Sequence, residues 1–282
     1  MHASSSSRRF SLPLASALAA SALVACGGAE PGTLEVTVYG ESFIEVGIPA
    51  SEVVDGWSVT FDRFLVSIGG ATAQAGHGAD ELSAPGYRIF DLARPSGGAG
   101  YVLATLDAPA GTYDHFGFVL RPDASATAGN ASAADVDALK AAGHSVRVVG
   151  TATRGADTIE FDWGFALTIV HSHCEVSHTV DGNTISIEAT IHGDHLLYDD
   201  AVAAEPDLAF DLIAAADGAD GSLPDGRVTP AELAAQDITG QERYQVGSLD
   251  IDDLWGFISH QVGTLGHVDG EGHCEDIQVS GI

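Results

Sequence analysis

The oxygen-bearing residues between Asp220 and Glu232 form the densest set of possible metal ligands in the chain. Hard oxygen atoms are the ligands that Ca²⁺ requires, and a carboxylate that closes such a set can supply two of them. We expect this segment to bind Ca²⁺, with Arg227 contributing its backbone carbonyl. The expected ligands are Asp220, Ser222, Asp225, Arg227, Thr229 and Glu232.

The end of this segment, Asp225 to Leu233, resembles the second half of an EF-hand calcium loop. Gly226 matches the glycine of the sharp turn, and Val228 matches the apolar residue inside the loop. A regular spacing would place Gly221 at the first ligand position, so one inserted residue is needed for Asp220 to take it. The loop is therefore EF-hand-like but degenerate. The alternative is an acidic surface turn that caps the following helix.

A second candidate site depends on the turn pair Asp181-Gly182, which lies between two strand-like runs. A two-residue hairpin turn at these positions would make His171 face His192 across the hairpin. Because side chains alternate along a strand, His173 would lie on the same face. We expect a histidine cluster that binds Zn²⁺ or Cu²⁺, since imidazole suits both ions. Its expected ligands are His171, His173, His192 and His195.

The first part of the chain indicates export. Residues 1–25 contain Arg8 and Arg9 followed by a short apolar run, which is typical of a signal peptide and too short for a membrane span. The sequence LVACG around Cys26 resembles the lipobox of bacterial lipoproteins. That resemblance implies a lipid on Cys26 that anchors the protein to a membrane, with residues 26–32 as a tether. An ordinary secreted protein cut near Ala25 is the alternative.

Compartment, charge and cysteine content limit the possible partners. The absence of Asp after Cys26 is compatible with an outer-membrane location, by resemblance to enteric lipoproteins. A formal net charge of −29 disfavours nucleic acid and favours cations. With Cys26 lipidated, Cys174 and Cys274 remain, and two cysteines in an exported chain predict a disulfide. The sequence identifies no protein or glycan partner.

Alternating apolar residues predict a mainly β protein, an antiparallel β-sandwich over residues 33–200. Residues 201–282 are expected to form a small helical, EF-hand-like appendage packed on the sandwich. Helical spacing indicates helices at 133–142, 205–216 and 250–265, although Leu208, Phe210 and Leu212 could equally form a strand. The runs WSVTFDRFLVSI and APAGTYDHFGFVL resemble uncharacterised bacterial lipoproteins with a transthyretin-like or carboxypeptidase-regulatory-like β-sandwich. That resemblance covers about residues 33–121 and implies no catalytic residue.

Three functions follow from these features. The first is a non-catalytic, membrane-tethered protein of the cell envelope with a structural or binding role and a calcium-stabilised loop. The second is a lipoprotein that binds Zn²⁺ or Cu²⁺ through the histidine cluster. The third is a metal-dependent hydrolase with Asp194 or Glu188 as base. The sequence has no nucleophile elbow, P-loop, dinucleotide fingerprint or H-E-x-x-H helix, so we expect no enzyme.

Overall fold

Alternation of buried and exposed side chains produces the strands of this protein. The computed structural model describes residues 28–76 and 78–281. In the strand Val146–Arg154, for example, Val146, Val148 and Ala152 are fully buried, while Arg147, Val149 and Thr151 are partly exposed. Strands make up 46% of the chain and helices 15%. The expected mainly β sandwich with small helical parts is therefore confirmed.

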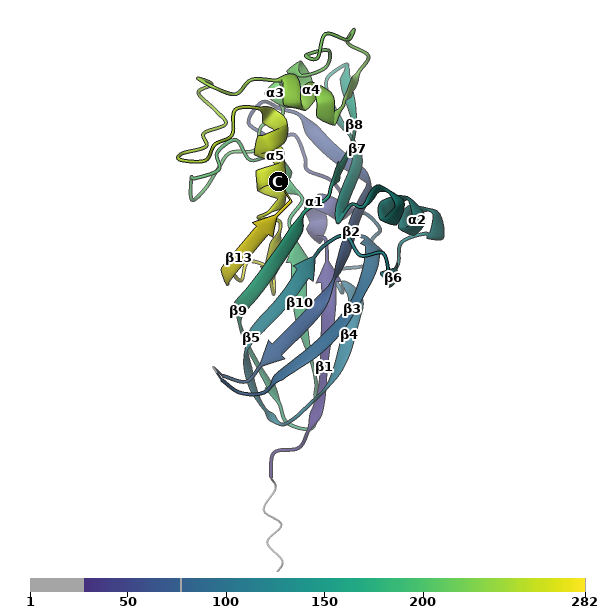
Figure 1. Cartoon of the computed structure of the whole chain (residues 1–282), viewed down its shortest axis with the longest axis vertical. Coiled ribbons are helices and arrows are strands. Elements are labelled where there is room, and N and C mark those ends of the chain that lie inside the picture. The colour runs from purple at the N-terminus through teal and green to yellow at the C-terminus, as the bar shows by residue number, and fades with distance from the viewer. Residues whose placement is uncertain (1–27, 77, 282) are drawn as a thin grey trace, which may run out of the picture.

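The strands form two sheets that enclose one hydrophobic core (Figure 1). The four-stranded sheet has the order β12 (Gly266–Val268), β10 (Thr184–Ile191), β1 (Gly32–Tyr39), β4 (Tyr101–Ala108). The nine-stranded sheet has the order β11 (Arg227–Val228), β8 (Asp157–Phe165), β7 (Val146–Arg154), β2 (Ser58–Gln74), β5 (Gly111–Leu120), β9 (Thr168–Val180), β13 (Cys274–Ser280). Two further strands of this sheet lie off that path: β3 (Glu81–Asp91), which pairs with β2, and β6 (Thr127–Ala128), which pairs with β3.

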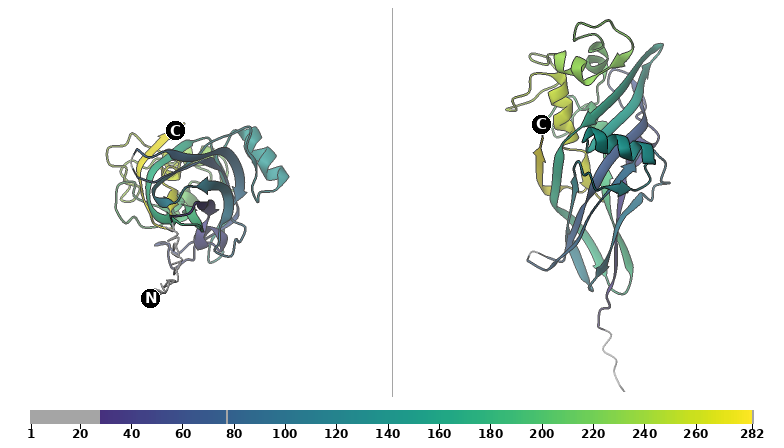
Figure 2. Two further views of the ribbon diagram at one scale, coloured as in Figure 1. Left: turned by 90° about the horizontal axis from the view of Figure 1, so that it is seen from below. Right: turned by 45° about the vertical axis from the view of Figure 1, so that its right-hand side comes forward.

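Short helices connect and cover these strands. They are α1 (Glu41–Glu45), α2 (Ala133–Ala142), the 3₁₀ helix η1 (Asp194–Leu197), α3 (Asp211–Ala215), α4 (Pro230–Ala235) and α5 (Leu254–Val262). The described chain starts at one end of the elongated molecule, and α3, α4 and α5 lie towards the opposite end (Figure 2). Within the described residues, no helix has the length and apolar character that crossing a membrane requires. The predicted signal peptide, Cys26 and Gly27 lie outside the described residues.

The predicted hairpin at Asp181-Gly182 is wrong. β9 belongs to the large sheet, where it pairs with β5 and β13, whereas β10 pairs in parallel with β1 in the small sheet. The turn therefore carries the chain from one sheet to the other. Its polar groups bind the segment before β1, because Gly182 donates to the Glu30 carbonyl and Asp181 accepts from the Glu30 amide. β1 thus occupies the place beside β10 that the hairpin assigned to β9.

Residues 201–282 are more than a helical appendage. They contribute β11, β12 and β13 to the two sheets, and Leu233, Phe257 and Val262 belong to the same core cluster as the strands. The helix predicted at 133–142 forms as α2, and the one predicted at 250–265 forms over the shorter range of α5, which Asp253 caps by accepting from the Gly256 amide.

The helix predicted at 205–216 is restricted to α3. Leu208 instead forms isolated β-bridges with Val53 and Tyr198, so the chain before α3 is extended. The Asp55 carboxylate then accepts hydrogen bonds from the amides of Phe210 and Asp211, where the helix begins. The sequence pattern at 205–212 fitted both structures, and these tertiary contacts decide between them.

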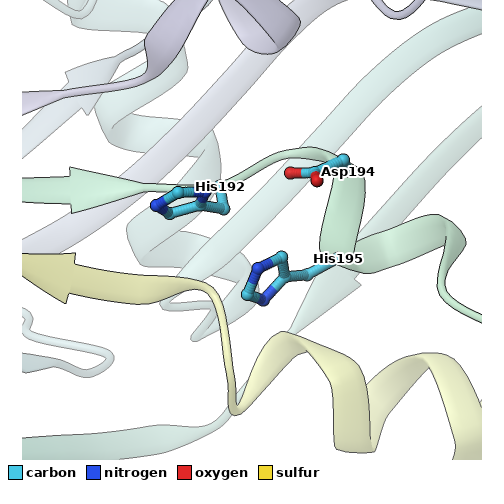
Figure 3. Close-up of side chains that lie close together, drawn as sticks. All are labelled: His192, Asp194 and His195. Carbon is cyan, nitrogen blue, oxygen red and sulfur yellow. The ribbon is translucent and has the colours of Figure 1, made fainter. Parts of the chain in front are cut away.

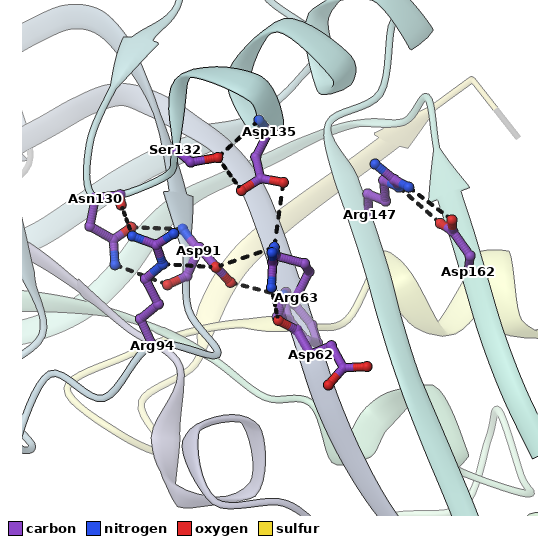
Figure 4. A network of polar contacts seen from close by, with 10 residues as sticks. Asp62, Arg63, Asp91, Arg94, Asn130, Ser132, Asp135, Arg147 and Asp162 are labelled. Carbon is purple, nitrogen blue, oxygen red and sulfur yellow. Dashed lines mark hydrogen bonds and ion pairs between the residues drawn. The ribbon is translucent and has the colours of Figure 1, made fainter. Parts of the chain in front are cut away.

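A buried carboxylate fixes the junction of β2, β3 and α2 (Figure 4). Asp91 is 1% exposed, accepts from the Phe64 amide at 3.2 Å and pairs with Arg94 at 3.1 Å. The side chain of Asn130 also exchanges two hydrogen bonds with the Asp91 backbone. Because a buried charge is costly without partners, this network holds the strand ends in one arrangement.

The predicted disulfide between Cys174 and Cys274 is confirmed. The two cysteines are direct neighbours across β9 and β13, so the bond fastens an exposed edge strand to the sheet. It also fixes the short segment between β12 and β13, which carries His273 next to Cys274.

Replacing both cysteines by alanine should destabilise the fold by about 4 to 5 kcal/mol. The bond closes a loop with a sequence separation of 100, and loops of this length lose the most unfolded-state entropy on cross-linking. Urea unfolding of the double variant, beside the oxidised and the reduced wild type, measures the difference. Equal midpoints for the oxidised protein and the double variant would show that the disulfide does not constrain folding.

Candidate metal centre

The end of strand β10 positions a compact cluster of metal-binding side chains. Ile191 is fully buried in the core, and the chain then runs through His192, Gly193, Asp194 and His195 into η1. A side chain at Gly193 would overlap with Ile44 of α1, so only glycine allows this close approach. The strand end is thereby packed firmly against α1, and the two histidines on either side of the glycine are held in place.

Strand pairing brings two more residues to this point from distant parts of the chain. Thr190 of β10 is paired with Tyr39 in the parallel β1 and with His267 in the antiparallel β12. Because the strands β1 and β10 run in the same direction, Glu41 follows Tyr39 as His192 follows Thr190. The Glu41 carboxylate therefore lies 3.3 Å from Nδ1 of His192.

The three imidazole rings lie side by side. Ring centroids are 4.4 Å apart for His192 and His267, 5.1 Å for His192 and His195, and 5.3 Å for His195 and His267. Two imidazoles on one tetrahedral Zn²⁺ have centroids about 5 Å apart, since the Zn–N bond is about 2.0 Å. Each pair of rings is therefore spaced as two ligands of one ion would be, although the ligand atoms of His195 and His267 fall in two different groups around His192.

Two overlapping triads have their ligand atoms within 4.8 Å of one another: His192 with Asp194 and His195, and His192 with His267 and Glu271. His192 is common to both triads. Figure 3 shows the first triad, with the Asp194 carboxylate and both rings grouped between the end of β10 and η1. The first triad is the more buried, because Glu271 of the second is exposed.

Hydrogen bonds on the outer side of the rings determine which nitrogen is free to bind an ion. The Thr264 hydroxyl donates to the Gln261 carbonyl at 2.9 Å, so it accepts from Nδ1 of His195, also at 2.9 Å. Nε2 of His195 is left as the ligand atom. In His192, Nε2 lies 3.2 Å from the Gly270 carbonyl, which can only accept, so Nδ1 would be the ligand atom, and an ion bound there would also lie near the Glu41 carboxylate. Metal-bound histidines in proteins are held in the same way.

Two buried acceptor atoms at the centre have no hydrogen-bond partner: Oδ1 of Asp194 and Nδ1 of His267. Buried polar atoms are nearly always paired, and an unpaired one calls for an explanation such as an ion. Burial raises the pKa of Asp194, although His192 opposes the shift. A cation held by the first triad would supply the missing partner of Asp194, and one held by the second triad would lie beside His267.

Burial keeps the imidazoles in the neutral form that metal binding requires. Desolvation, together with the neighbouring histidines, lowers the pKa of His195 to about 3 and that of His267 to about 4. A histidine binds a metal ion only when the ligand nitrogen carries no proton. At neutral pH both rings are therefore ready to bind an ion without releasing a proton.

Of the four histidines predicted as ligands, the structure brings together His192 and His195. His171 lies at the border of the cluster, stacked on Phe118 at 4.4 Å with both ring nitrogens buried and unpaired. His173 lies elsewhere, on β9, where it pairs with Asp276 at 3.1 Å. The sequence argument missed His267, Glu41 and Glu271, because only strand pairing and the segment after β12 bring them near.

The burial of His171 makes the metal-free fold sensitive to acid. Burial lowers the pKa of His171 to about 3, whereas an unfolded histidine has a pKa of about 6.5. The unfolded state therefore binds the proton first, and stability falls as the pH drops from 6.5 towards 3, by about 1.4 kcal/mol per pH unit. Between pH 7.5 and pH 5, the free energy of unfolding should fall by about 2 kcal/mol less in His171→Leu than in wild type, as measured by urea unfolding. Equal losses would contradict this assignment.

The predicted calcium loop is closed by its own hydrogen bonds. Glu232 is 4% exposed, and its two oxygens accept from Gly218, Ser222 and both the amide and hydroxyl of Thr229. Burial alone would raise the pKa of Glu232, but these bonds hold it below the usual value. Thr229 and Glu232 form a capping box for α4, so the alternative of a turn that caps the next helix is observed. Calcium binding stays a prediction.

Asp217 organises this loop, and the sequence argument missed it. Its two oxygens accept from the amides of Asp225 and Gly226 at 2.9 and 2.8 Å. Asp220, predicted as the first ligand, is exposed and bonds only locally, to the Ser222 amide. Asp217 reaches the turn from further back in the chain. It would have been found if a longer insertion in the EF-hand spacing had been allowed.

Calcium at the loop would raise the thermal unfolding midpoint. We expect a gain of about 1.4 kcal/mol when Ca²⁺ is present at ten times its dissociation constant. Glu232→Gln should remove the gain, while Glu205→Gln, a change at an exposed residue, should keep it. A midpoint that does not respond to Ca²⁺ in the wild type would leave the loop with its capping role alone.

Comparisons of the chain with protein-family models, with curated proteins and with solved structures give no match. What the site can do must therefore be argued from its own geometry.

Proposed function

We propose that this protein is a membrane-tethered, extracytoplasmic lipoprotein that binds a transition-metal ion, Zn²⁺ or Cu²⁺, at the end of strand β10. His192, Asp194 and His195 are the proposed ligands, with His267 beside them. The observation that carries the proposal is the triad itself, whose ligand atoms lie within 4.8 Å of one another and include the buried, unpaired Oδ1 of Asp194. Nitrogen ligands with one carboxylate suit Zn²⁺ and Cu²⁺ better than Ca²⁺ or Mg²⁺.

The position of the cluster fits a tethered protein. β1 starts next to the proposed lipid anchor and runs parallel to β10, so the cluster lies at the far end of both strands. Eight residues of β10 span about 25 Å at about 3.3 Å per residue. A lipid on Cys26 would thus hold the membrane well away from the metal ion, and the ion would face the surrounding compartment.

The surroundings of the cluster favour a doubly charged ion. Burial raises the pKa of Glu41 and of Asp194, and the nearby carboxylate of Glu271 raises both further. A dication bound among these carboxylates removes the repulsion between them, and this favours its binding. Exposed Glu271 leaves one side of the site open to exchange, which suits a protein that stores or hands over an ion.

Thermal unfolding of the purified, metal-stripped full chain tests this proposal. An ion that binds only the folded state must raise its stability, by about 2.7 kcal/mol at a hundredfold excess over the dissociation constant. We expect Zn²⁺ or Cu²⁺ to raise the midpoint of the wild type and His195→Ala to abolish the rise.

His173→Ala is the matched control, since it removes a histidine that pairs with Asp276 on another part of the surface. It should keep the full metal response. The proposal is wrong if neither ion shifts the wild-type midpoint, or if His173→Ala loses the response as completely as His195→Ala.

A further inference from the structure

The two triads of the candidate metal centre differ in their access to solvent. In the first triad, His192 and His195 are buried, at 3% and 7% exposure. In the second triad, His192 is joined by the partly exposed His267 and by Glu271, which is exposed. The second triad therefore contains the ligand that is most open to the surrounding solution.

His192 belongs to both triads and has one lone pair for an ion. Its Nε2 lies 3.2 Å from the Gly270 carbonyl and donates to it, which leaves Nδ1 as the ligand atom. Two ion positions that share this atom lie at most about 4 Å apart, because the Zn–N bond is about 2.0 Å long. One lone pair binds one ion at a time, so the two triads are alternative positions for a single ion.

The residues around His192 allow an ion to change its other ligands without leaving this ring. The ring centroid of His192 lies 4.4 Å from that of His267 and 5.1 Å from that of His195, so the shared ring has one further imidazole in each triad. The Glu41 carboxylate lies 3.3 Å from Nδ1 of His192 and belongs to neither triad. A negative charge therefore stays beside the ion in both positions.

Glu271 lies in a tight turn that the sheets hold in place. Asp269, two residues before it, accepts from the Glu188 amide at 3.0 Å. The other oxygen of Asp269 lies 2.7 Å from Nε2 of His178. One carboxylate thus fastens the turn to β10 in the small sheet and to β9 in the large sheet.

The backbone of this turn is also closed on itself. The Val268 amide donates to the Gly272 carbonyl at 3.0 Å, and the Gly272 amide donates back at 2.8 Å. A side chain at Gly272 would overlap with the Val268 carbonyl, so only glycine allows this closure. The Gly270 amide adds a hydrogen bond of 2.9 Å to the Thr190 hydroxyl of β10. The turn therefore positions its exposed carboxylate before an ion arrives, which lowers the cost of binding.

We propose that the second triad is the entry position of the metal centre, through which a single Zn²⁺ ion passes to and from the first triad. This inference rests on the proposed function. The ion binds at Glu271, His267 and His192, and it then keeps His192 while Asp194 and His195 replace the other two ligands. The reverse order of exchange releases it.

Stopped-flow mixing of the metal-stripped full chain with Zn²⁺, followed with a fluorescent zinc indicator, tests this inference. An entry position lowers the barrier between the free and the bound ion and contributes to neither end state. Glu271→Gln should therefore slow uptake and release of Zn²⁺ by the same factor, at least fivefold, and keep the dissociation constant within threefold of the wild-type value. The substitution preserves the shape of an exposed side chain, so the variant should fold as the wild type does.

Glu275→Gln is the matched control. It removes the same charge from an exposed residue of β13 that belongs to neither triad, and it should keep both rates. Equal slowing by the two substitutions would overturn the inference, because a general loss of charge would then explain it. Two Zn²⁺ ions bound per wild-type chain would also overturn it.

Two further outcomes separate this inference from the proposed function. If Glu271→Gln exchanges Zn²⁺ as fast as the wild type, the ion does not enter through the second triad, and the entry position is wrong while the metal centre stands. If the variant raises the dissociation constant at least tenfold with an unchanged uptake rate, Glu271 is a ligand of the final site and the entry position is again wrong. A wild type that binds no Zn²⁺ overturns the entry position, and the thermal unfolding test with both ions then decides on the proposed function.

Discussion

The parallel pairing of β10 with β1 is the constraint on which the rest of the structure depends. It separates β9 from β10, so that the turn at Asp181-Gly182 joins two sheets and not two neighbouring strands. Parallel strands end at the same edge, and the residues that follow them meet there. Glu41 and His192 are such residues, and they lie 151 positions apart in the chain, so no local sequence pattern connects them. The candidate metal centre is a direct result of this pairing, because an antiparallel arrangement would have put these two residues at opposite ends of the strands.

The C-terminal segment completes the centre from the other side. β12 adds His267 beside β10, and the following turn adds the Gly270 carbonyl that fixes the His192 ring. The chain then enters β13, an exposed edge strand that the Cys174–Cys274 disulfide fastens to the large sheet. The same short segment therefore connects both sheets and holds one wall of the cluster. Its position depends on a covalent bond more than on burial, since nearly all of β13 is exposed.

The sequence predicted the parts of this structure that depend on local pattern. Alternating apolar residues predicted the β class, and helical spacing predicted α2. Two cysteines in a chain expected to be exported predicted the disulfide. His192 and His195 were predicted as ligands from a hairpin register that is wrong, and they come together because they are close in the chain at the end of β10. The pairing partner of β10 was not predictable in this way, since a tight turn pair such as Asp181-Gly182 is the usual signal of a hairpin. His267 and Asp217 were missed for the same reason: strand pairing brings one to its site and a long loop brings the other.

Electrostatics shapes the candidate metal centre. The chain has a formal net charge of −29, yet burial keeps His195 and His267 in their neutral form, so they offset none of the charge of the carboxylates beside them. Nitrogen ligands and clustered carboxylates together favour a compact dication. The excess negative charge attracts cations in general, and the geometry of the ligand atoms, not the charge, decides which cation the centre selects.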